Sequence, residues 1–443
     1  MTDPRDRDPL LNVDTSRRRV LGGLGLAAAG CPFSGLMAGQ AQAKAARAAM
    51  PGHVTDAPVL DAASPDDRVP FFGVRQAGIV TPRPANGMVA SFHVVAATPQ
   101  EMEDLLRRLT DRIAFLTEGG TPPALDPRLP PADSGIVGPV VRPDALTVTV
   151  ALGASLFDDR PWLAPLKPLR LSRMTRFPND ALDASLCHGD LALQICANTQ
   201  DTTIHALRDI VRNLPDRLVL KWKQEGNVPV IAPGPDGQAE SARNFLGFRD
   251  GSANPDASDT ALMDRLVFVG PERGEPDWAL GGSYQLVRII RNFVERWDRT
   301  PLREQEAIMG RVRSTGAPLD RPQASEFEAP DYAADPDGLA TPLDSHIRLA
   351  NPRTRESEEN VILRRPFNYS NGVTRAGQLD QGLLFICYQA DLEKGFIAVQ
   401  RRLDGEPLEE YIKPVGGGYF FALPGVRDAS DYLGSALIAA LAR

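Results

Sequence analysis

The sequence predicts an α+β fold built from two ferredoxin-like domains with antiparallel sheets. The chain has 443 residues, of which 42% are hydrophobic, and this is enough for two domains with sizeable cores. In the first half, strand-like and helix-like segments follow one another in the split βαβ order strand–helix–strand, strand–helix–strand, and the second half follows a similar order. A stretch rich in proline and glycine, residues 226–239, separates the halves and predicts the domain boundary.

The first half supplies the more regular elements. Residues 87–96 are rich in β-branched side chains and predict the first strand. Thr98 and Pro99 then provide a helix N-cap and a proline at the first helical position. Leucine and isoleucine residues follow at helical spacing, which gives this helix one apolar face. The other predicted elements of this half are strands at 146–152, 190–197 and 218–222 and a helix at 202–214.

The second half repeats this pattern. Its predicted elements are strands at 284–290, 382–388 and 419–423 and helices at 301–311 and 392–403. The unit at 383–403 has a hydrophobic pattern similar to that of the unit at 89–113, which indicates an internal repeat. We therefore expect an N-terminal domain at residues 81–232 and a C-terminal domain at 233–443, preceded by an extended lead-in at 44–80.

The first 43 residues are typical of a targeting segment. Ser16 is followed by three arginines, then by a Gly/Ala/Leu-rich stretch at 22–30, and residues 41–43 supply a small-residue cleavage site. Consecutive arginines before a weakly hydrophobic stretch indicate a twin-arginine export signal, and an ordinary secretory signal is the alternative. Because this route exports folded proteins, we expect a periplasmic location and a cofactor that is loaded before export.

The net charge and the cysteine content exclude several kinds of partner and site. The formal net charge of −8 argues against nucleic acid or an anionic membrane surface as the main partner, and we expect no stable membrane anchor. After the export signal the cysteines are Cys187, Cys196 and Cys387, an odd and sparse set that is not a disulfide framework. His188 lies beside Cys187, but this spacing lacks the paired close ligands of a zinc site.

His346 is the candidate metal ligand among the five histidines of the chain. A lone histidine is more often a hydrogen-bonded structural residue, but His346 stands at the edge of an arginine-rich segment that reaches Arg353. A neutral imidazole binds haem iron well, and a carboxylate that accepts its other N–H strengthens it as a donor. Asp391 and Glu393 are both candidates for this carboxylate, and the sequence does not choose between them.

Asp250 and Arg364 are the candidate acid–base and charge-stabilising residues. Asp250 precedes Gly251 on a loop that can approach a cofactor closely, where such an acid carries a proton between the two oxygens of hydrogen peroxide; a plain Asp-Gly turn is the alternative. A fixed guanidinium at Arg364 would stabilise developing negative charge, whereas a surface arginine on an edge strand is the alternative. Arg348 and Arg353 are candidates for pairing with the carboxylates of a cofactor or with acids of the protein.

Taken together, these segments resemble the dye-decolourising (DyP-type) haem peroxidases. Residues 247–251 match the G-x-x-D-G signature of that family, and the run from 346 to 365 resembles its haem-ligand and distal-arginine region. Residues 187–197 and 415–425 are similar to segments of its periplasmic branch, the deferrochelatase/peroxidases of the bacterial ferrous-iron uptake system. The resemblance spans nearly the whole chain after the export signal.

The resemblance implies a fold of the dimeric α+β barrel type, with one haem b per chain in the C-terminal domain. It makes His346 the proximal iron ligand, Asp250 the distal acid–base and Arg364 the distal arginine. It also implies hydrogen peroxide and an organic reductant, or haem itself, as substrates, with iron released from haem while the tetrapyrrole stays intact. Other components of an iron-uptake system and a second copy of the chain, as a homo-oligomer, are candidate partners. A haem carrier without turnover is the competing function, and it has no use for a distal acid and arginine.

Overall fold

The computed structural model describes residues 64–229, 231 and 240–442. The predicted export signal and the first part of the predicted lead-in lie outside these residues. Residues 64–80 contain no helix and no strand longer than a single bridge. They are nevertheless packed against the fold, since the buried amide of Gln76 donates to the backbone oxygens of Val150 and Leu423, both at 2.8 Å.

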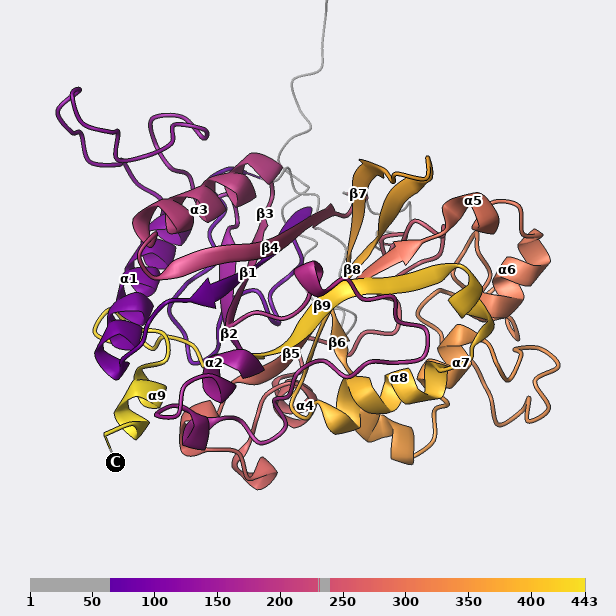
Figure 1. Cartoon of the computed structure of the whole chain (residues 1–443). Helices are drawn as coiled ribbons and strands as arrows, with labels where there is room; N and C mark the ends of the chain where they lie inside the picture. The colour runs from indigo at the N-terminus through magenta and orange to yellow at the C-terminus, as the bar shows by residue number, and fades with distance from the viewer. Residues whose placement is uncertain (1–63, 230, 232–239, 443) are drawn as a thin grey trace, which may run out of the picture. The chain divides into compact units, whose positions relative to one another are not determined.

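The first half forms the predicted sheet with two helices against it. Its strands pair antiparallel in the order β4-β1-β3-β2, which is the order of a ferredoxin-like sheet. The Thr98 side chain caps the first helix by accepting from the backbone N–H of Glu101 at 3.2 Å, as predicted. The elements are β1 (Asn86–Val94), α1 (Pro99–Glu118), β2 (Thr147–Gly153), α2 (Ala154–Asp158), β3 (Leu191–Ala197), α3 (Gln200–Asn213) and β4 (Leu218–Asn227). The two long helices α1 and α3 contact each other beside this sheet (Figure 1).

The second half repeats the same sheet. Its four long strands are β5 (Ser283–Asn292), β7 (Phe367–Val373), β8 (Leu379–Gln389) and β9 (Ile412–Ala422). They pair antiparallel in the order β9-β5-β8-β7, which is the same permutation of chain order as in the first half, so the two halves repeat one sheet. The predicted match between the units at 383–403 and 89–113 is wrong, because β8 takes the place of β3 and β5 takes the place of β1. The helices are α4 (Thr260–Leu266), α5 (Val294–Trp297), α6 (Leu302–Met309), α7 (His346–Ala350), α8 (Ala398–Leu403) and α9 (Ser435–Ala440).

The strands of the two halves close into one antiparallel barrel. β2 pairs with β9 over three residue pairs, and β4 pairs with β7 through the single pair Asn227–Asn368. The short strand β6 (Leu363–Arg364) adds to β8, and the pairing of β5 with β8 completes the ring. The predicted class, an α+β fold with ferredoxin-like antiparallel sheets of the barrel type, is confirmed. The division of the chain into separate domains at residues 232 and 233 stays a prediction.

The strand β7 and five short helices have no counterpart in the sequence prediction, and one predicted helix is broken; the five helices are α2, α4, α5, α7 and α9. β7 is absent from the prediction because Asn371-Gly372 is typical of a turn and Ser370–Val373 are exposed, so the segment lacks the apolar alternation of a strand. The predicted helix at 392–403 is broken, since Glu393–Ile397 form a π-helical turn in which Gly395 has a non-helical ψ of −110°. Glycine permits this backbone conformation, and the α-helix α8 begins only after it.

The three cysteines within the described residues are free and buried, as expected for a chain without a disulfide framework. Burial raises the pKa of Cys196 to about 11, so this thiol stays protonated and acts as a core side chain. The described part of the chain holds no group of three or more His, Cys, Asp or Glu residues arranged for a metal ion.

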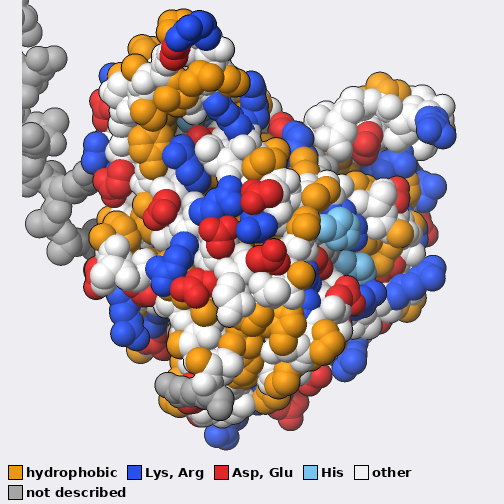
Figure 2. All heavy atoms as spheres, turned by 60° about the vertical axis from the view of Figure 1, so that its left-hand side comes forward, with side chains coloured by type: hydrophobic (Ala, Val, Ile, Leu, Met, Phe, Trp, Pro, Cys, Tyr) orange, Lys and Arg blue, Asp and Glu red, His pale blue; other side chains and the backbone are white. Residues whose placement is uncertain are grey.

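The surface agrees with the acidic but mixed composition. On the face that Figure 2 shows, acidic and basic side chains are interspersed and no large patch of one sign is visible. Among the helices of the described residues, none has both the length and the apolar character that a membrane span requires.

Candidate active site

One cavity in the second half brings together the three residues that the sequence singles out. His346 is the first residue of α7, Arg364 is the last residue of β6, and Asp250 lies in the loop that precedes α4. All three line this cavity. Because the segments are far apart in the sequence, the site exists only in the folded chain.

Glu406 holds the imidazole of His346. Its carboxylate oxygen Oε2 lies 2.7 Å from Nδ1, and the Glu406 side chain is only 3% exposed. The N–H at Nδ1 donates to this carboxylate, which leaves Nε2 as the nitrogen that can bind a metal. The side chain of His346 is 30% exposed and lines the cavity. This is the arrangement of a metal-ligating histidine that is oriented by a carboxylate.

The prediction that Asp391 or Glu393 accepts the N–H of His346 is wrong, because Glu406 does so. Asp391 is buried, pairs with Arg170 at 2.8 Å and accepts the backbone N–H of Glu393. Glu406 lies 60 residues from His346 in sequence and reaches it because α7 packs against α8, which ends just before this glutamate. Such a contact depends on tertiary packing and has no motif in the sequence.

The pKa of His346 is raised above the ordinary value of a histidine. Burial lowers the pKa of the imidazole, but the negative charge of Glu406 and its hydrogen bond raise it by more. Arg364 and Asp250 also act on it, in opposite directions, as expected for groups that share one cavity. Glu406 therefore makes the imidazole electron-rich, which favours its binding to a metal.

Asp250 and Arg364 form an ion pair inside the cavity. The Nη1 of Arg364 donates to Oδ1 of Asp250 at 2.7 Å, with 12% of the Asp250 side chain and 27% of the Arg364 side chain exposed. Asn254 fixes the Arg364 backbone with two hydrogen bonds, donating to its oxygen at 2.8 Å and accepting from its N–H at 3.2 Å. Asp250 is thus more than a turn residue, and Arg364 is not a free surface arginine.

The other predicted cofactor residues divide into two groups. Gly251 and Arg353 line the cavity, and both have positive φ, 134° and 57°. Arg353 is exposed, and its φ lies in the left-handed region, which is strained for a residue other than glycine. Arg348 does not line the cavity, because its guanidinium is held by Asp335 at 3.1 Å and by the backbone oxygen of Thr341 at 2.8 Å. The predicted contact of Arg348 with a cofactor is therefore not supported.

Three further arginines line the cavity and were not predicted as site residues: Arg249, which neighbours Asp250, and Arg288 and Arg311. Arg288 lies in β5 and forms a buried ion pair with Asp180 of the first half. Arg311 follows α6 and donates to the backbone oxygens of Gly316 at 3.0 Å and Glu326 at 2.9 Å, and burial lowers its pKa. Neither Arg288 nor Arg311 belongs to a motif, so only the fold identifies them.

The residues present fit a haem. Nε2 of His346 is a nitrogen donor for iron, and the Arg311 and Arg353 guanidinium groups suit the carboxylates of a tetrapyrrole. Several large apolar side chains supply the surface that a flat macrocycle needs. They are Met309, Leu383, Phe385, Phe396 and Leu403. An acid–base pair on the same cavity adds the means to move a proton at a bound ligand.

Comparison with known proteins agrees with this site and this fold. The family models for the N-terminal and C-terminal parts of Dyp-type peroxidases match residues 76–227 and 241–427. The chain therefore belongs to the Dyp-type peroxidase family, a family of enzymes.

Its relatives in sequence are more specific. The chain is 55% identical over 428 residues to the deferrochelatase of Escherichia coli O157:H7, covering 96% of this chain and 97% of that protein. The deferrochelatase of Shigella flexneri is 54% identical over 426 residues, with the same coverage.

Solved structures show the same fold. A DyP-type peroxidase from Cellulomonas bogoriensis matches with a TM-score of 0.74 and 35% identity, covering 85% of this chain and 99% of that one. Ferric DtpA from Streptomyces lividans matches with a TM-score of 0.75 and 34% identity, covering 84% and 98%.

Proposed function

We propose that the chain is a haem-dependent peroxidase that binds one haem b and uses hydrogen peroxide to oxidise an organic donor. The observation that supports this most is the presence, on one cavity, of the His346–Glu406 pair and the Asp250–Arg364 pair. The first pair suits an iron ligand and the second suits peroxide chemistry. Family membership supports the same reaction.

The residues of the chain have separate roles in this reaction. A bound haem would supply the iron and its redox chemistry. Nε2 of His346 would hold that iron, while Glu406 keeps the imidazole in one tautomer and one orientation. Asp250 takes a proton from one peroxide oxygen and returns it to the other, and Arg364 stabilises the negative charge that develops as the O–O bond breaks.

A second activity, release of iron from haem with the tetrapyrrole intact, is also part of this proposal. It is supported by the relatives that are named deferrochelatase and match 96% of the chain. Oxidation by peroxide and release of iron leave different products, so both are measurable on one preparation.

The test is an absorption spectrum of the purified protein with and without peroxide, followed by assays for free iron and metal-free porphyrin. We expect a haem spectrum that changes with peroxide and recovers when an organic donor is added, and metal-free porphyrin under iron-releasing conditions. A carrier without turnover, the alternative function, would give a haem spectrum with no donor oxidation and no porphyrin product.

We also propose that the protein acts in the periplasm, after twin-arginine export, alongside other components of an iron-uptake system. The support is the arginine run at 17–19 and the small-residue site at 41–43, both in the N-terminal segment. Fractionation of cells that carry Arg17→Lys and Arg18→Lys together checks this, since retention in the cytoplasm is expected and normal export would contradict it.

Replacing Glu406 by glutamine is expected to leave haem bound but to weaken His346 as an iron donor. The amide keeps the shape of the side chain but removes the negative charge that raises the pKa of the imidazole. The reduction potential of the iron should rise, and activity should fall about 10- to 100-fold, as is typical when the partner of a ligating histidine is lost. Spectroelectrochemical titration measures the potential, and Glu409→Gln, which changes another acid of the cavity lining, is the matched control. An unchanged potential in Glu406→Gln would contradict the assignment.

A further inference from the structure

A buried glutamate, Glu326, holds the segment that carries Asp250. We define the acid hairpin as residues 241–252, a narrow turn with Asp250 near its second end. Its two sides are joined by the bridge between Arg243 and Arg249 and by a hydrogen bond from the N–H of Asp250 to the oxygen of Ala242 at 2.8 Å. The hairpin contains no helix or long strand, so its position depends on side chains from elsewhere.

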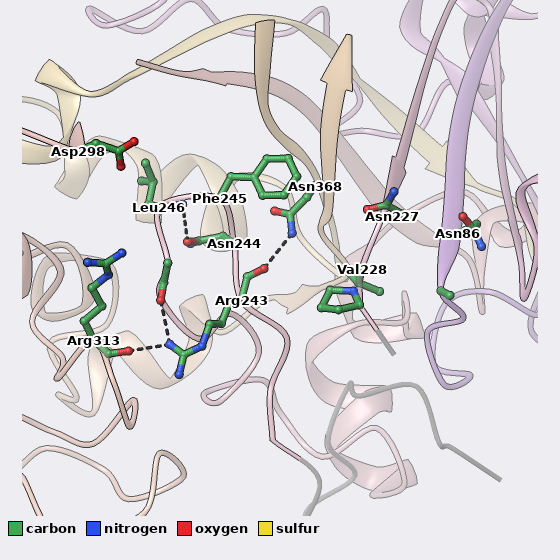
Figure 3. A pocket seen from close by; sticks show the side chains of 13 residues that line it. Asn86, Asn227, Val228, Arg243, Asn244, Phe245, Leu246, Asp298, Arg313 and Asn368 are labelled. Carbon is green, nitrogen blue, oxygen red and sulfur yellow. Dashed lines mark hydrogen bonds between the residues drawn. The ribbon is translucent and has the colours of Figure 1, made fainter. Parts of the chain in front are cut away.

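Side-chain hydrogen bonds fix the tip of the acid hairpin (Figure 3). The guanidinium of Arg243 donates to the backbone oxygens of Gly247 at 2.8 Å and Arg313 at 2.6 Å. The side chain of Asn368 donates to the Arg243 oxygen at 2.8 Å, and Asn244 accepts from the N–H of Leu246 at 3.1 Å. These contacts hold the tip, but none of them touches the two ends of the hairpin.

Glu326 holds both ends. One carboxylate oxygen, Oε1, accepts the backbone N–H of Ser241 at 3.0 Å, and the other, Oε2, accepts the hydroxyl of Ser252. Ser252 is two residues from Asp250, and both line the cavity. One carboxylate thus joins the start of the hairpin to the residue just after its acid.

The burial of Glu326 indicates that its carboxylate is retained for its contacts with the hairpin and not for packing. Its side chain is 5% exposed, and the nearest cation is Arg249, whose Nε lies 3.9 Å away and which also pairs with the exposed Glu240. Burial of a carboxylate is costly unless it is hydrogen-bonded and paired, and an apolar side chain would fill this space at lower cost. The backbone oxygen of Glu326 in turn accepts from Arg311, so the same residue links the hairpin to another side of the cavity.

We propose that Glu326 is a positioning residue that fixes the acid hairpin so that the carboxylate of Asp250 stays against Arg364. It acts through Asp250 and does not itself reach the reacting atoms. This inference rests on the proposed peroxidase function. A displacement of about 1 Å at a proton-transferring group can lower the rate of the catalysed step by about 100-fold. A shift of the hairpin, which carries Asp250, should therefore lower peroxidase turnover.

The first test compares two substitutions at Glu326 in the haem-loaded protein. Glu326→Ala removes both contacts and should lower kcat about 10- to 100-fold while the haem spectrum stays normal. Glu326→Gln should restore a rate close to wild type, because its amide oxygen can accept from Ser241 and its NH₂ group can donate to the Ser252 oxygen. Glu328→Gln is the control, since Glu328 is an exposed acid of the same loop that forms an ion pair with Arg321 at the surface. Wild-type turnover in Glu326→Ala would overturn the proposal.

The second test asks whether Glu326 acts through Asp250. In a protein that already carries Asp250→Asn, adding Glu326→Ala should produce no further loss of rate, because residues that act as a unit are not additive. An additional loss of the same size as in the wild type would overturn the proposal. If Glu326→Ala fails to fold, Ser252→Ala removes one of the two contacts and should give a smaller loss in the same direction.

The third test does not depend on activity. Backbone amides of residues 241–252 should exchange hydrogen faster in Glu326→Ala than in wild type, while exchange elsewhere in the barrel stays unchanged. Equal exchange in both proteins would overturn the proposal. If wild-type protein shows no peroxidase turnover at all, the proposed function fails, and hydrogen exchange still decides whether Glu326 holds the hairpin.

Discussion

Replacing His346 by alanine is expected to abolish the Soret band of bound haem. The imidazole is the nitrogen donor of the cavity, and Glu406 holds it at 2.7 Å so that Nε2 is free to bind iron. Without it, only apolar contacts and the arginines remain to retain the tetrapyrrole. The measurement is the absorption spectrum of the purified variant after reconstitution with haem.

Two controls separate loss of the ligand from loss of the fold. His93 is an exposed histidine of β1, so His93→Ala should bind haem as the wild type does. Added imidazole should enter the space left in His346→Ala and restore a haem spectrum, which a misfolded protein would not allow. A normal Soret band in His346→Ala without added imidazole would contradict the assignment of this residue as the iron ligand.

The elements that the sequence predicts well are those whose side-chain pattern is local. The helix that begins after Thr98 has its cap, its proline and its apolar face within one segment, and it forms as predicted. β7 has no such pattern, because only Phe367–Tyr369 are buried and the rest of the strand faces solvent. It becomes a strand through pairing with β8, a contact that sequence periodicity does not contain. The closure of the two sheets likewise depends on pairs such as Asn227–Asn368.

The residues of the candidate site also fall into two groups, those with a local sequence pattern and those defined only by tertiary contacts. His346, Asp250 and Arg364 stand in short segments with an unusual combination of residue types, and the structure brings all three to one cavity. Glu406 and Glu326 are ordinary glutamates in the sequence, and only their buried contacts show what they hold. For Arg348 the sequence predicts a cofactor contact that the structure does not support. This arginine is close to His346 in sequence, but its guanidinium donates to Asp335. Sequence therefore identifies the reacting groups better than the groups that position them.

Replacing Arg364 by leucine is expected to leave haem bound while peroxidase turnover falls about 100- to 1,000-fold, the usual cost of removing one fixed donor from a developing negative charge. Arg364 holds Asp250 at 2.7 Å but does not touch His346 by any hydrogen bond, so ligand binding and peroxide chemistry should separate in this variant. The measurement is kcat/KM for hydrogen peroxide at saturating donor, together with the Soret spectrum.

The size of this effect depends on geometry as well as charge. Arg364→Lys keeps the positive charge but loses the planar fork that Asn254 positions through the backbone, so its turnover should lie between that of leucine and that of the wild type. Arg375→Leu, in the exposed turn between β7 and β8, removes one positive charge far from the cavity lining and should change nothing. Full turnover in Arg364→Leu would show that another group stabilises the charge, and Arg249 and Arg311 of the same cavity would then be the residues to substitute.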